Sequence, residues 1–205
     1  MVRTYLLPLA ALVSMQTGFA QSSVEWSNAT ASGNGCPIGT SIVTVTPGGD
    51  EIAWTFDTFG FNLSRGPATA SLFCRLSASA RIKKGLYLGR LTQEMTYGAT
   101  KSARGSSLSV GAQSRFFGKN LPELIQEYPD GIEFDSPLQS AASSFDLEPK
   151  LESEFFCDLP NPVGLFQSTL SAAGRVTGSG TAALNIQGQN VTFRAITTWL
   201  DCSKV

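Results

Sequence analysis

The sequence predicts an all-β fold: an antiparallel, jelly-roll-like β-sandwich that is stapled by two disulfides and contains at most one or two short helices. Three observations predict it. Short apolar runs recur between turn signals, without the helical periods that would separate the strands of βαβ units. The 205 residues include 20 Gly and 10 Pro, which suit short strands joined by turns. The four cysteines are an even number, as a disulfide framework requires.

The first twenty residues have the features of a secretion signal. Arg3 supplies a basic start, residues 5–13 form a short apolar run, and Gly18 and Ala20 supply the small residues of a cleavage site. The apolar run is far shorter than the roughly 20 residues that span a bilayer. We therefore expect residues 1–20 to be removed and the mature protein to be secreted, with no membrane span.

The next segment is small and polar. Residues 21–35 predict a flexible, exposed N-terminal arm in which Trp26 faces solvent. A single globular domain is expected to begin at Cys36 and to cover residues 36–205.

The first two expected strands flank a strong turn. Residues 41–46 are rich in β-branched side chains and end at the Pro-Gly-Gly-Asp sequence of residues 47–50. Residues 51–57 follow and place Ile52, Trp54 and Phe56 on one face. We expect this face to lie in the core.

Residues 74–83 alternate strictly between apolar and polar side chains, which predicts a half-buried strand. The apolar positions are Cys74, Leu76, Ala78, Ala80 and Ile82, and the polar positions are Arg75, Ser77, Ser79, Arg81 and Lys83. Arg75, Arg81 and Lys83 therefore form a candidate basic face.

The remaining strands are expected over residues 86–97, 107–117, 165–172, 180–187 and 191–200. Trp199 belongs to the apolar face of the last of these and is expected in the core. Residues 121–128 predict a short helix, with Pro122 in its first turn. Residues 178–183 match the G-x-G-x-x-A pattern, but no helix is expected after them, so we interpret them as a turn.

Four cysteines allow three disulfide pairings. We favour Cys36–Cys74 with Cys157–Cys202, because each pair closes a loop in one half of the chain. Each such loop stabilises the fold by about 4 kcal/mol in the chain-entropy model. A four-cysteine metal site is disfavoured because no closely spaced C-x-x-C pair occurs.

The chain contains three N-glycosylation sequons, at Asn28, Asn62 and Asn190. In a eukaryotic secretory pathway at least one is expected to be occupied. Any occupied asparagine must face solvent because the glycan is bulky.

The charges are strongly segregated along the chain. Residues 61–119 contain ten Lys and Arg against the single acid Glu94, and residues 120–158 contain ten acids against the single base Lys150. In one interpretation the acidic segment lies across the basic face and neutralises it. In the other the basic face is bare and binds anionic wall polymers. We expect the covered arrangement.

The absence of histidine excludes Ser-His-Asp and Cys-His catalysis and imidazole metal sites. No motif predicts a catalytic residue, a metal or a cofactor, and no pattern of interleaved aromatics predicts nucleic-acid binding. We expect a non-enzymatic binding or structural module whose partner is a cell-wall polysaccharide or another extracellular polymer. The alternative is a small hydrolase, either a carboxylate-based glycosidase or a glutamic-peptidase-like enzyme. The peptidase would pair Glu127 or Glu133 with Gln93 or Gln113.

Several separated motifs resemble one family. They are residues 33–40 (GNGCPIGT), 54–59 (WTFDTF), 74–76 (CRL), 97–98 (YG), 108–111 (LSVG), 116–118 (FFG) and 197–202 (TTWLDC). Together they resemble the small secreted, fungal-type proteins of domain of unknown function 4360, over about residues 33–202. The resemblance implies secretion, a β-rich fold and paired cysteines. It carries over no catalytic residues.

Overall fold

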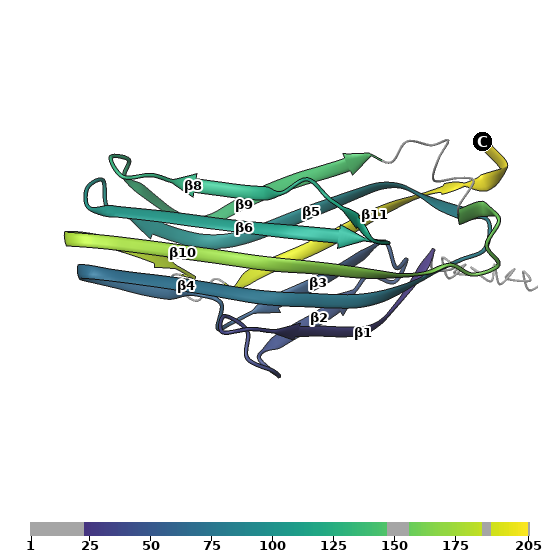
Figure 1. Ribbon diagram of the computed structural model, residues 1–205, viewed down its shortest axis with the longest axis horizontal. Helices are drawn as coiled ribbons and strands as arrows, with labels where there is room; N and C mark the ends of the chain where they lie inside the picture. Colours follow the sequence, from purple (N-terminus) through teal and green to yellow (C-terminus); the bar gives the residue numbers. More distant parts are fainter. Residues whose placement is uncertain (1–22, 147–155, 186–189, 205) are drawn as a thin grey trace, which may run out of the picture.

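The computed structural model describes residues 23–146, 156–185 and 190–204, and within them eleven strands form an antiparallel β-sandwich (Figure 1). The strands are β1 (Val24–Ser32), β2 (Ser41–Val45), β3 (Glu51–Phe56), β4 (Phe61–Ile82), β5 (Leu86–Lys101), β6 (Ser106–Phe116), β7 (Lys119–Asn120), β8 (Leu124–Tyr128), β9 (Phe134–Asp146), β10 (Val163–Leu184) and β11 (Val191–Asp201). A 3₁₀ turn, Cys202–Lys204, follows β11. The predicted all-β sandwich is confirmed.

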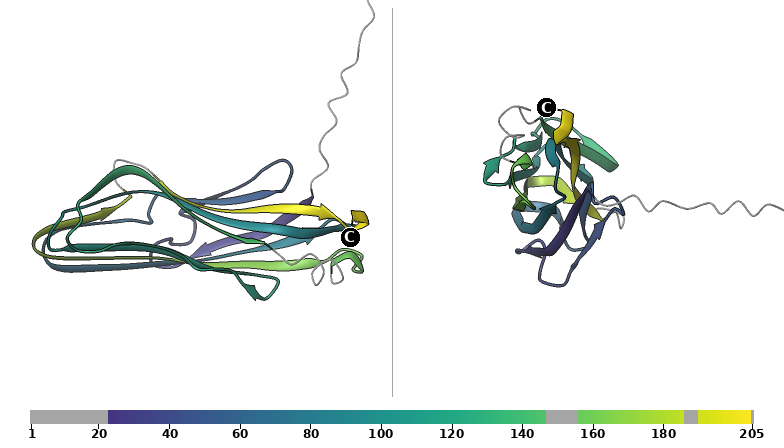
Figure 2. Two further views of the ribbon diagram at one scale, coloured as in Figure 1. Left: turned by 90° about the horizontal axis from the view of Figure 1, so that it is seen from above. Right: turned by 90° about the vertical axis from the view of Figure 1, so that its right-hand side faces the viewer.

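The strands form two layers. One layer, the front sheet, has the order β8-β6-β10-β4-β1, and the other, the back sheet, has the order β9-β5-β11-β3-β2. The layers lie one behind the other in Figure 1 and separate when viewed from above in Figure 2. They join at one end, where residues 182–184 of β10 pair with residues 99–101 of β5. Long strands β4 and β10 run side by side along the front sheet.

The predicted inward faces form the core between the sheets. The apolar positions of β4 from Cys74 to Ile82 are at most 2% exposed. Trp54 of β3 stacks on Phe166 of β10 with 5.9 Å between ring centroids, and Phe193 of β11 packs 6.3 Å from both. This aromatic cluster connects the two sheets. Trp199, expected in the core, is only half-buried.

Both favoured disulfides are confirmed, Cys36–Cys74 and Cys157–Cys202. The first ties the loop after β1 to the middle of β4, and both of its cysteines are fully buried. The second ties the segment before β10 to the end of β11, and both of its cysteines are half-buried. Neither cysteine pair is available for a metal site.

The predicted N-terminal arm is wrong for residues 24–32, which form the edge strand β1 along β4. Trp26 is half-buried rather than exposed; its Nε1 donates to the carbonyl of Gly49 at 2.7 Å, and its ring stacks on Phe116. Only Val24 in this strand is fully buried, so most of its side chains are free to be polar. The alternation of Val24 and Trp26 was too short to predict it.

The predicted helix over residues 121–128 is also wrong, because residues 124–128 form strand β8 against β6. Leu124 and Tyr128 are the buried positions, and a spacing of four residues fits one face of a helix or of a strand. The tertiary partner decides between them: the Tyr128 hydroxyl lies 2.8 Å from that of Tyr97 in β5. Burial raises the pKa of both hydroxyls, so both are protonated and one donates to the other.

The strand predicted over residues 165–172 and the first part of the strand predicted over residues 180–187 belong to one 22-residue strand, β10, which ends at Leu184. Residues 186–187 of that prediction lie outside the described residues. The glycine-rich segment between them is a bulge rather than a turn: Gly178 has a φ of 60°, and the pairing with β4 shifts register there. A Cβ on Gly180 would lie 2.2 Å from the carbonyl oxygen of Gly105, so glycine permits a close approach. Strand β4 likewise begins earlier than predicted, at Phe61.

Candidate binding face

The outer surface of the front sheet carries the predicted polar side of β4. Alternation along the strand places Arg75, Ser77, Ser79 and Arg81 outward and at least partly exposed. Because directly opposed residues in an antiparallel sheet face the same side, the pairing register fixes their neighbours on β10 and β6.

Two rows of polar side chains cross the three central strands. In the first row Thr169 of β10 is aligned with Arg75 of β4 and with Gln113 of β6. In the second row Gln167 is aligned with Arg115 of β6. The rows are two residues apart along each strand, which corresponds to about 7 Å. The aligned rows bring guanidinium, amide and hydroxyl groups to one patch.

The two rows line an open hollow of about 440 Å³. Its outward-facing lining residues are Arg75, Gln113, Arg115, Asn120, Gln167 and Thr169. Its volume falls in the range of small-molecule sites. Among the described residues, the lining includes no carboxylate side chain. We call these six residues the arginine hollow.

Neighbouring groups hold both arginines of the hollow in place. The Arg115 Nε donates to the Gln167 Oε1 at 2.6 Å, and the Arg75 guanidinium carbon lies 5.8 Å from the centroid of the Phe73 ring. Phe73 is 42% exposed, so a large aromatic ring faces solvent beside the hollow. In the part of the chain that the structure describes, neither arginine forms an ion pair with a carboxylate.

A track of small side chains continues from the hollow along the sheet. Ser171 and Ala173 of β10 are aligned with Gly111 and Ser109 of β6. The track reaches a second hollow of about 470 Å³, whose lining includes Arg175, Glu127 and Tyr128. The outer face therefore offers an extended path for a ligand rather than one enclosed pocket.

The three residues of the candidate basic face do not act as one cluster. Arg75 borders the hollow, whereas Arg81 lies 3.9 Å from Glu25 of β1 in an exposed pair, and Lys83 follows the end of β4. Sequence analysis missed the other members of the hollow because cross-strand register is not visible in one segment. A usable signal existed: Gln113 and Arg115 alternate with buried residues in β6.

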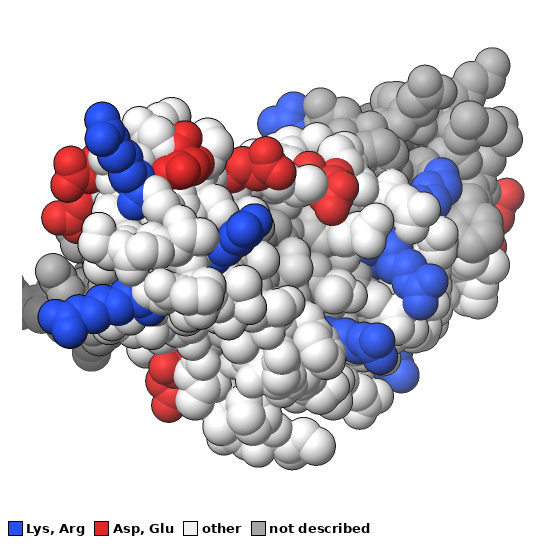
Figure 3. Space-filling model, turned by 60° about the vertical axis from the view of Figure 1, so that its left-hand side comes forward, with Lys and Arg blue, Asp and Glu red and all other residues white. Residues whose placement is uncertain are grey.

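The expected acidic cover is wrong for residues 120–146. Strand β8 pairs with β6 at the edge of the front sheet, and β9 pairs with β5 in the back sheet, so neither crosses β4. Figure 3 shows most of the visible acidic side chains along the upper margin, with Lys and Arg side chains spaced over the surface below. Residues 147–155 of the expected cover lie outside the described residues.

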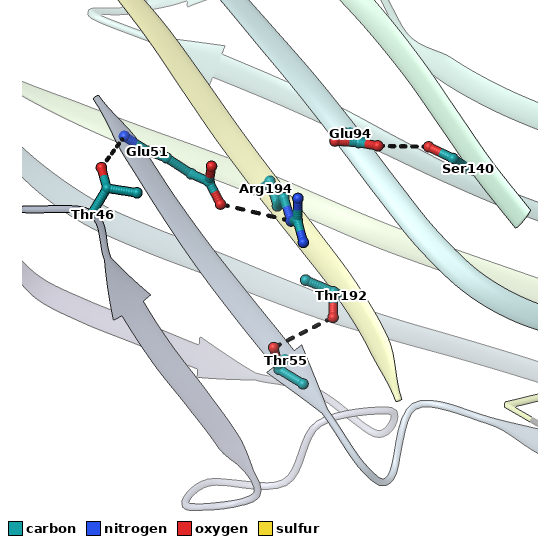
Figure 4. Close-up of polar contacts among 7 residues, drawn as sticks. All are labelled: Thr46, Glu51, Thr55, Glu94, Ser140, Thr192 and Arg194. Atoms are coloured by element: carbon teal, nitrogen blue, oxygen red, sulfur yellow. Dashed lines mark hydrogen bonds and ion pairs between the residues drawn. The ribbon is translucent and has the colours of Figure 1, made fainter. Parts of the chain in front are cut away.

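The outer face of the back sheet provides a contrast, because Glu51, Arg194 and Glu94 have partners within the sheet (Figure 4). The Arg194 Nε of β11 lies 3.7 Å from a carboxylate oxygen of Glu51, and Glu94 accepts a hydrogen bond from the Ser140 hydroxyl at 2.7 Å. Its central arginine is therefore neutralised by a neighbour. The arginine hollow of the front sheet has no such compensation among the described residues, and this makes it the candidate site.

The peptidase alternative is not supported by the positions of its residues. Gln93 is 1% exposed between the sheets, where its Oε1 accepts from Ser114 and its Nε2 donates to Ser143 and the carbonyl of Pro122. Glu127 faces solvent on the outer side of β8. Gln113 also faces outward, but Glu127 is aligned with a residue four positions away from it, about 13 Å along the strand. Both members of a catalytic pair must reach the same scissile bond, and a separation of about 13 Å along the strand does not meet this requirement.

These positions predict opposite effects for the two glutamines. Gln93→Leu is expected to lower the free energy of unfolding by about 1–3 kcal/mol, because the buried partners of its amide lose their hydrogen bonds. Gln113→Leu, at an exposed position, is expected to change it by no more than about 0.5 kcal/mol. Urea denaturation of both variants measures the difference, and equal effects would contradict the assignment of Gln93 to the interior.

The described residues contain no helix that is long and apolar enough to cross a membrane. They also contain no group of three or more Cys, Asp or Glu side chains placed to hold a metal ion.

Comparisons with known proteins locate the chain in one family. The model of the family described as domain of unknown function DUF4360 matches residues 22–136. No curated protein matches the chain.

Three solved structures show distant similarity. The carbohydrate-binding module TmCBM61 in complex with β-1,4-galactotriose has 14% identity and a TM-score of 0.32, covering 85% of this chain and 89% of that chain. A family 11 carbohydrate-binding module from Clostridium thermocellum, in complex with a mixed-linked tetrasaccharide, has 9% identity and a TM-score of 0.19, with coverages of 85% and 88%. The tailspike protein 4 active domain of bacteriophage CBA120 has 13% identity and a TM-score of 0.24, with coverages of 85% and 19%.

Proposed function

The chain belongs to the family described as domain of unknown function DUF4360, and because that description assigns no activity, we propose a function from the sandwich itself. The protein is a secreted, non-enzymatic module that binds an extracellular or cell-wall polysaccharide along the outer face of the front sheet. The arginine hollow is the centre of the binding site.

One observation carries this proposal: exposed amide, hydroxyl and guanidinium side chains are aligned by strand register around the hollow. Such groups donate and accept hydrogen bonds with sugar hydroxyls. The exposed ring of Phe73 beside them offers an apolar surface for the carbon face of a sugar. The track of small side chains leaves room for further sugar units beyond the hollow, along β10 and β6.

The chemistry of the hollow favours binding over hydrolysis. A carboxylate-based glycosidase requires two carboxyl groups about 5–10 Å apart across the scissile bond. The lining of the arginine hollow contains none. A polysaccharide held there meets donors and acceptors for its hydroxyls but no acid or base pair.

Several features support an extracellular location. The two disulfides suit an oxidising compartment. We propose that residues 1–20, which lie outside the described residues, are the signal that directs secretion. The sequon asparagines Asn28, Asn62 and Asn190 are all exposed, as glycan attachment requires.

The first test uses a panel of neutral and acidic polysaccharides. The protein is expected to be retarded in affinity gels containing at least one of them, without release of reducing sugar. The double variant Gln113→Ala/Gln167→Ala is expected to weaken this binding about tenfold, because two neutral hydrogen bonds together contribute about 1–3 kcal/mol.

The matched control lies on the opposite face. Thr55 and Thr192 form a half-buried hydroxyl pair at 3.4 Å on the back sheet, and the double variant Thr55→Ala/Thr192→Ala is expected to bind normally. Retardation by no polysaccharide, or equal weakening by both double variants, would refute the proposed site.

A further inference from the structure

The two arginines of the hollow differ from two other arginines of the sandwich, which form ion pairs with carboxylates. Arg194 lies 3.7 Å from Glu51, and Arg81 lies 3.9 Å from Glu25. Arg75 and Arg115, in contrast, form no ion pair within the described residues, although both are exposed at the same hollow. A hollow with two such cations and no carboxylate in its lining is complementary to an anion.

The arginines are also oriented for a ligand. The hydrogen bond from the Arg115 Nε to Gln167 fixes the plane of that guanidinium while its two terminal NH₂ groups are not used in this bond. The contact with Phe73 holds the Arg75 guanidinium over an exposed ring. A planar guanidinium with free paired donors is the group that binds carboxylate or sulfate through two parallel hydrogen bonds.

The positions of the arginines are compatible with a polymer that extends along the sheet. Arg75 lies on β4 and Arg115 on β6, with β10 between them, and their rows are two residues apart. Two strand spacings and one row separate their Cα atoms by about 12 Å. Anionic groups repeated along one chain can contact both arginines, and the open hollow leaves room for the chain to continue beyond them.

Acidic side chains near β8 affect which part of the outer face an anionic chain contacts. Glu127 and Asp130 lie beside Arg175 in the linings of the hollows nearest β8, so the positive charge of Arg175 is opposed there. No carboxylate opposes Arg75 and Arg115 in the arginine hollow. An anionic chain is therefore attracted more strongly to the arginine hollow than to the hollows beside β8, where Glu127 and Asp130 oppose Arg175.

We infer that the ligand is an acidic polysaccharide, whose carboxylate or sulfate groups bind Arg75 and Arg115. This inference rests on the proposed function, because it names the polymer class for the same hollow. It places charge recognition in the two arginines and recognition of hydroxyl groups in Gln113 and Gln167.

The test compares polymers that differ in charge but share a backbone. Polygalacturonate and its fully methyl-esterified form supply the carboxylate comparison, and dextran sulfate and dextran supply the sulfate comparison. At least one acidic polymer is expected to bind ten times more tightly than its neutral partner in low salt. Raising the salt concentration is expected to reduce the difference, because exposed charges are screened.

The variants assign that difference to residues. Arg75→Gln/Arg115→Gln is expected to weaken binding of the acidic polymer roughly fiftyfold, since each contact replaced is a charge-assisted hydrogen bond. Binding of the neutral partner is expected to weaken far less, because the glutamine amide can still donate a hydrogen bond to a sugar hydroxyl. Arg194→Gln on the back sheet is the matched control and is expected to bind like the parent. Circular dichroism checks that each variant is folded.

The outcomes separate this inference from the proposed function. Equal binding of acidic and neutral partners, with weakening by Gln113→Ala/Gln167→Ala, would overturn the inference and leave the proposed function standing. A charge preference that survives Arg75→Gln/Arg115→Gln would also overturn the inference. Absence of binding to every polymer would overturn both.

Discussion

Replacing Trp54 with alanine is expected to lower the free energy of unfolding by about 3–5 kcal/mol, as for other large aromatic residues in protein cores. Trp54 is fully buried and packs against Phe166 of the front sheet and Phe193 of the back sheet. Its removal leaves a cavity in the core between the two sheets. The sheets cannot close this cavity without moving their hydrogen-bonded strands. Urea denaturation followed by far-UV circular dichroism measures the loss.

Trp54→Phe separates ring packing from hydrogen bonding. The Trp54 Nε1 is buried and has no hydrogen-bond partner among the described residues. Phenylalanine removes this unpaired donor and keeps one aromatic ring, so its cost is expected to be less than half that of alanine. Equal losses for the two variants would indicate that the indole nitrogen has a partner, such as a buried water.

The strands with buried alternation could be predicted from sequence. In β3, in residues 74–82 of β4 and in residues 191–195 of β11, every second residue is apolar. The positions predicted to face inward are buried from Ile52 to Phe56 and from Cys74 to Ile82. This pattern is local, because each strand has one face on the core whatever its neighbours are. The same alternation predicted that the Arg75 side chain faces solvent.

The edge strands could not be predicted in the same way. Strand β1 contains mostly small polar residues, and its conformation depends on pairing with β4 across about fifty residues of chain. Strand β8 has too few alternating positions to distinguish a strand from a helix, and its pairing with β6 decides. Non-local partners thus overrode weak local preferences.

The binding hollow depends on register between strands. Arg75, Gln113 and Thr169 are far apart in sequence, and only the pairing of β10 with both β4 and β6 aligns them. The segregation of charge along the sequence also does not place the acidic segment opposite the basic face of β4. The β8–β9 segment passes from the front sheet to the back sheet, so its acids lie at the margin rather than over β4.

The two disulfides are expected to be reduced in sequence, with Cys157–Cys202 first. Cys157 and Cys202 are half-buried near the end of the sandwich, whereas Cys36 and Cys74 have no exposed surface. An external thiolate must contact a sulfur atom to attack it, so access controls the rate. Brief treatment with dithiothreitol, then alkylation and peptide mass spectrometry, is expected to label Cys157 and Cys202 alone.

Loss of both bonds is expected to unfold the domain. The bonds join cysteines 38 and 45 residues apart, and each contributes about 4 kcal/mol in the chain-entropy model. Their sum is comparable to the roughly 5–15 kcal/mol that stabilises a typical domain. The double variant Cys157→Ser/Cys202→Ser is therefore expected to fold, with a lowered urea midpoint. At a urea concentration at which this variant is still folded, adding dithiothreitol to reduce its remaining disulfide is expected to unfold it. Labelling of Cys36 before Cys202, or an unchanged midpoint in this variant, would contradict the assigned burial and the stabilising role of the second disulfide.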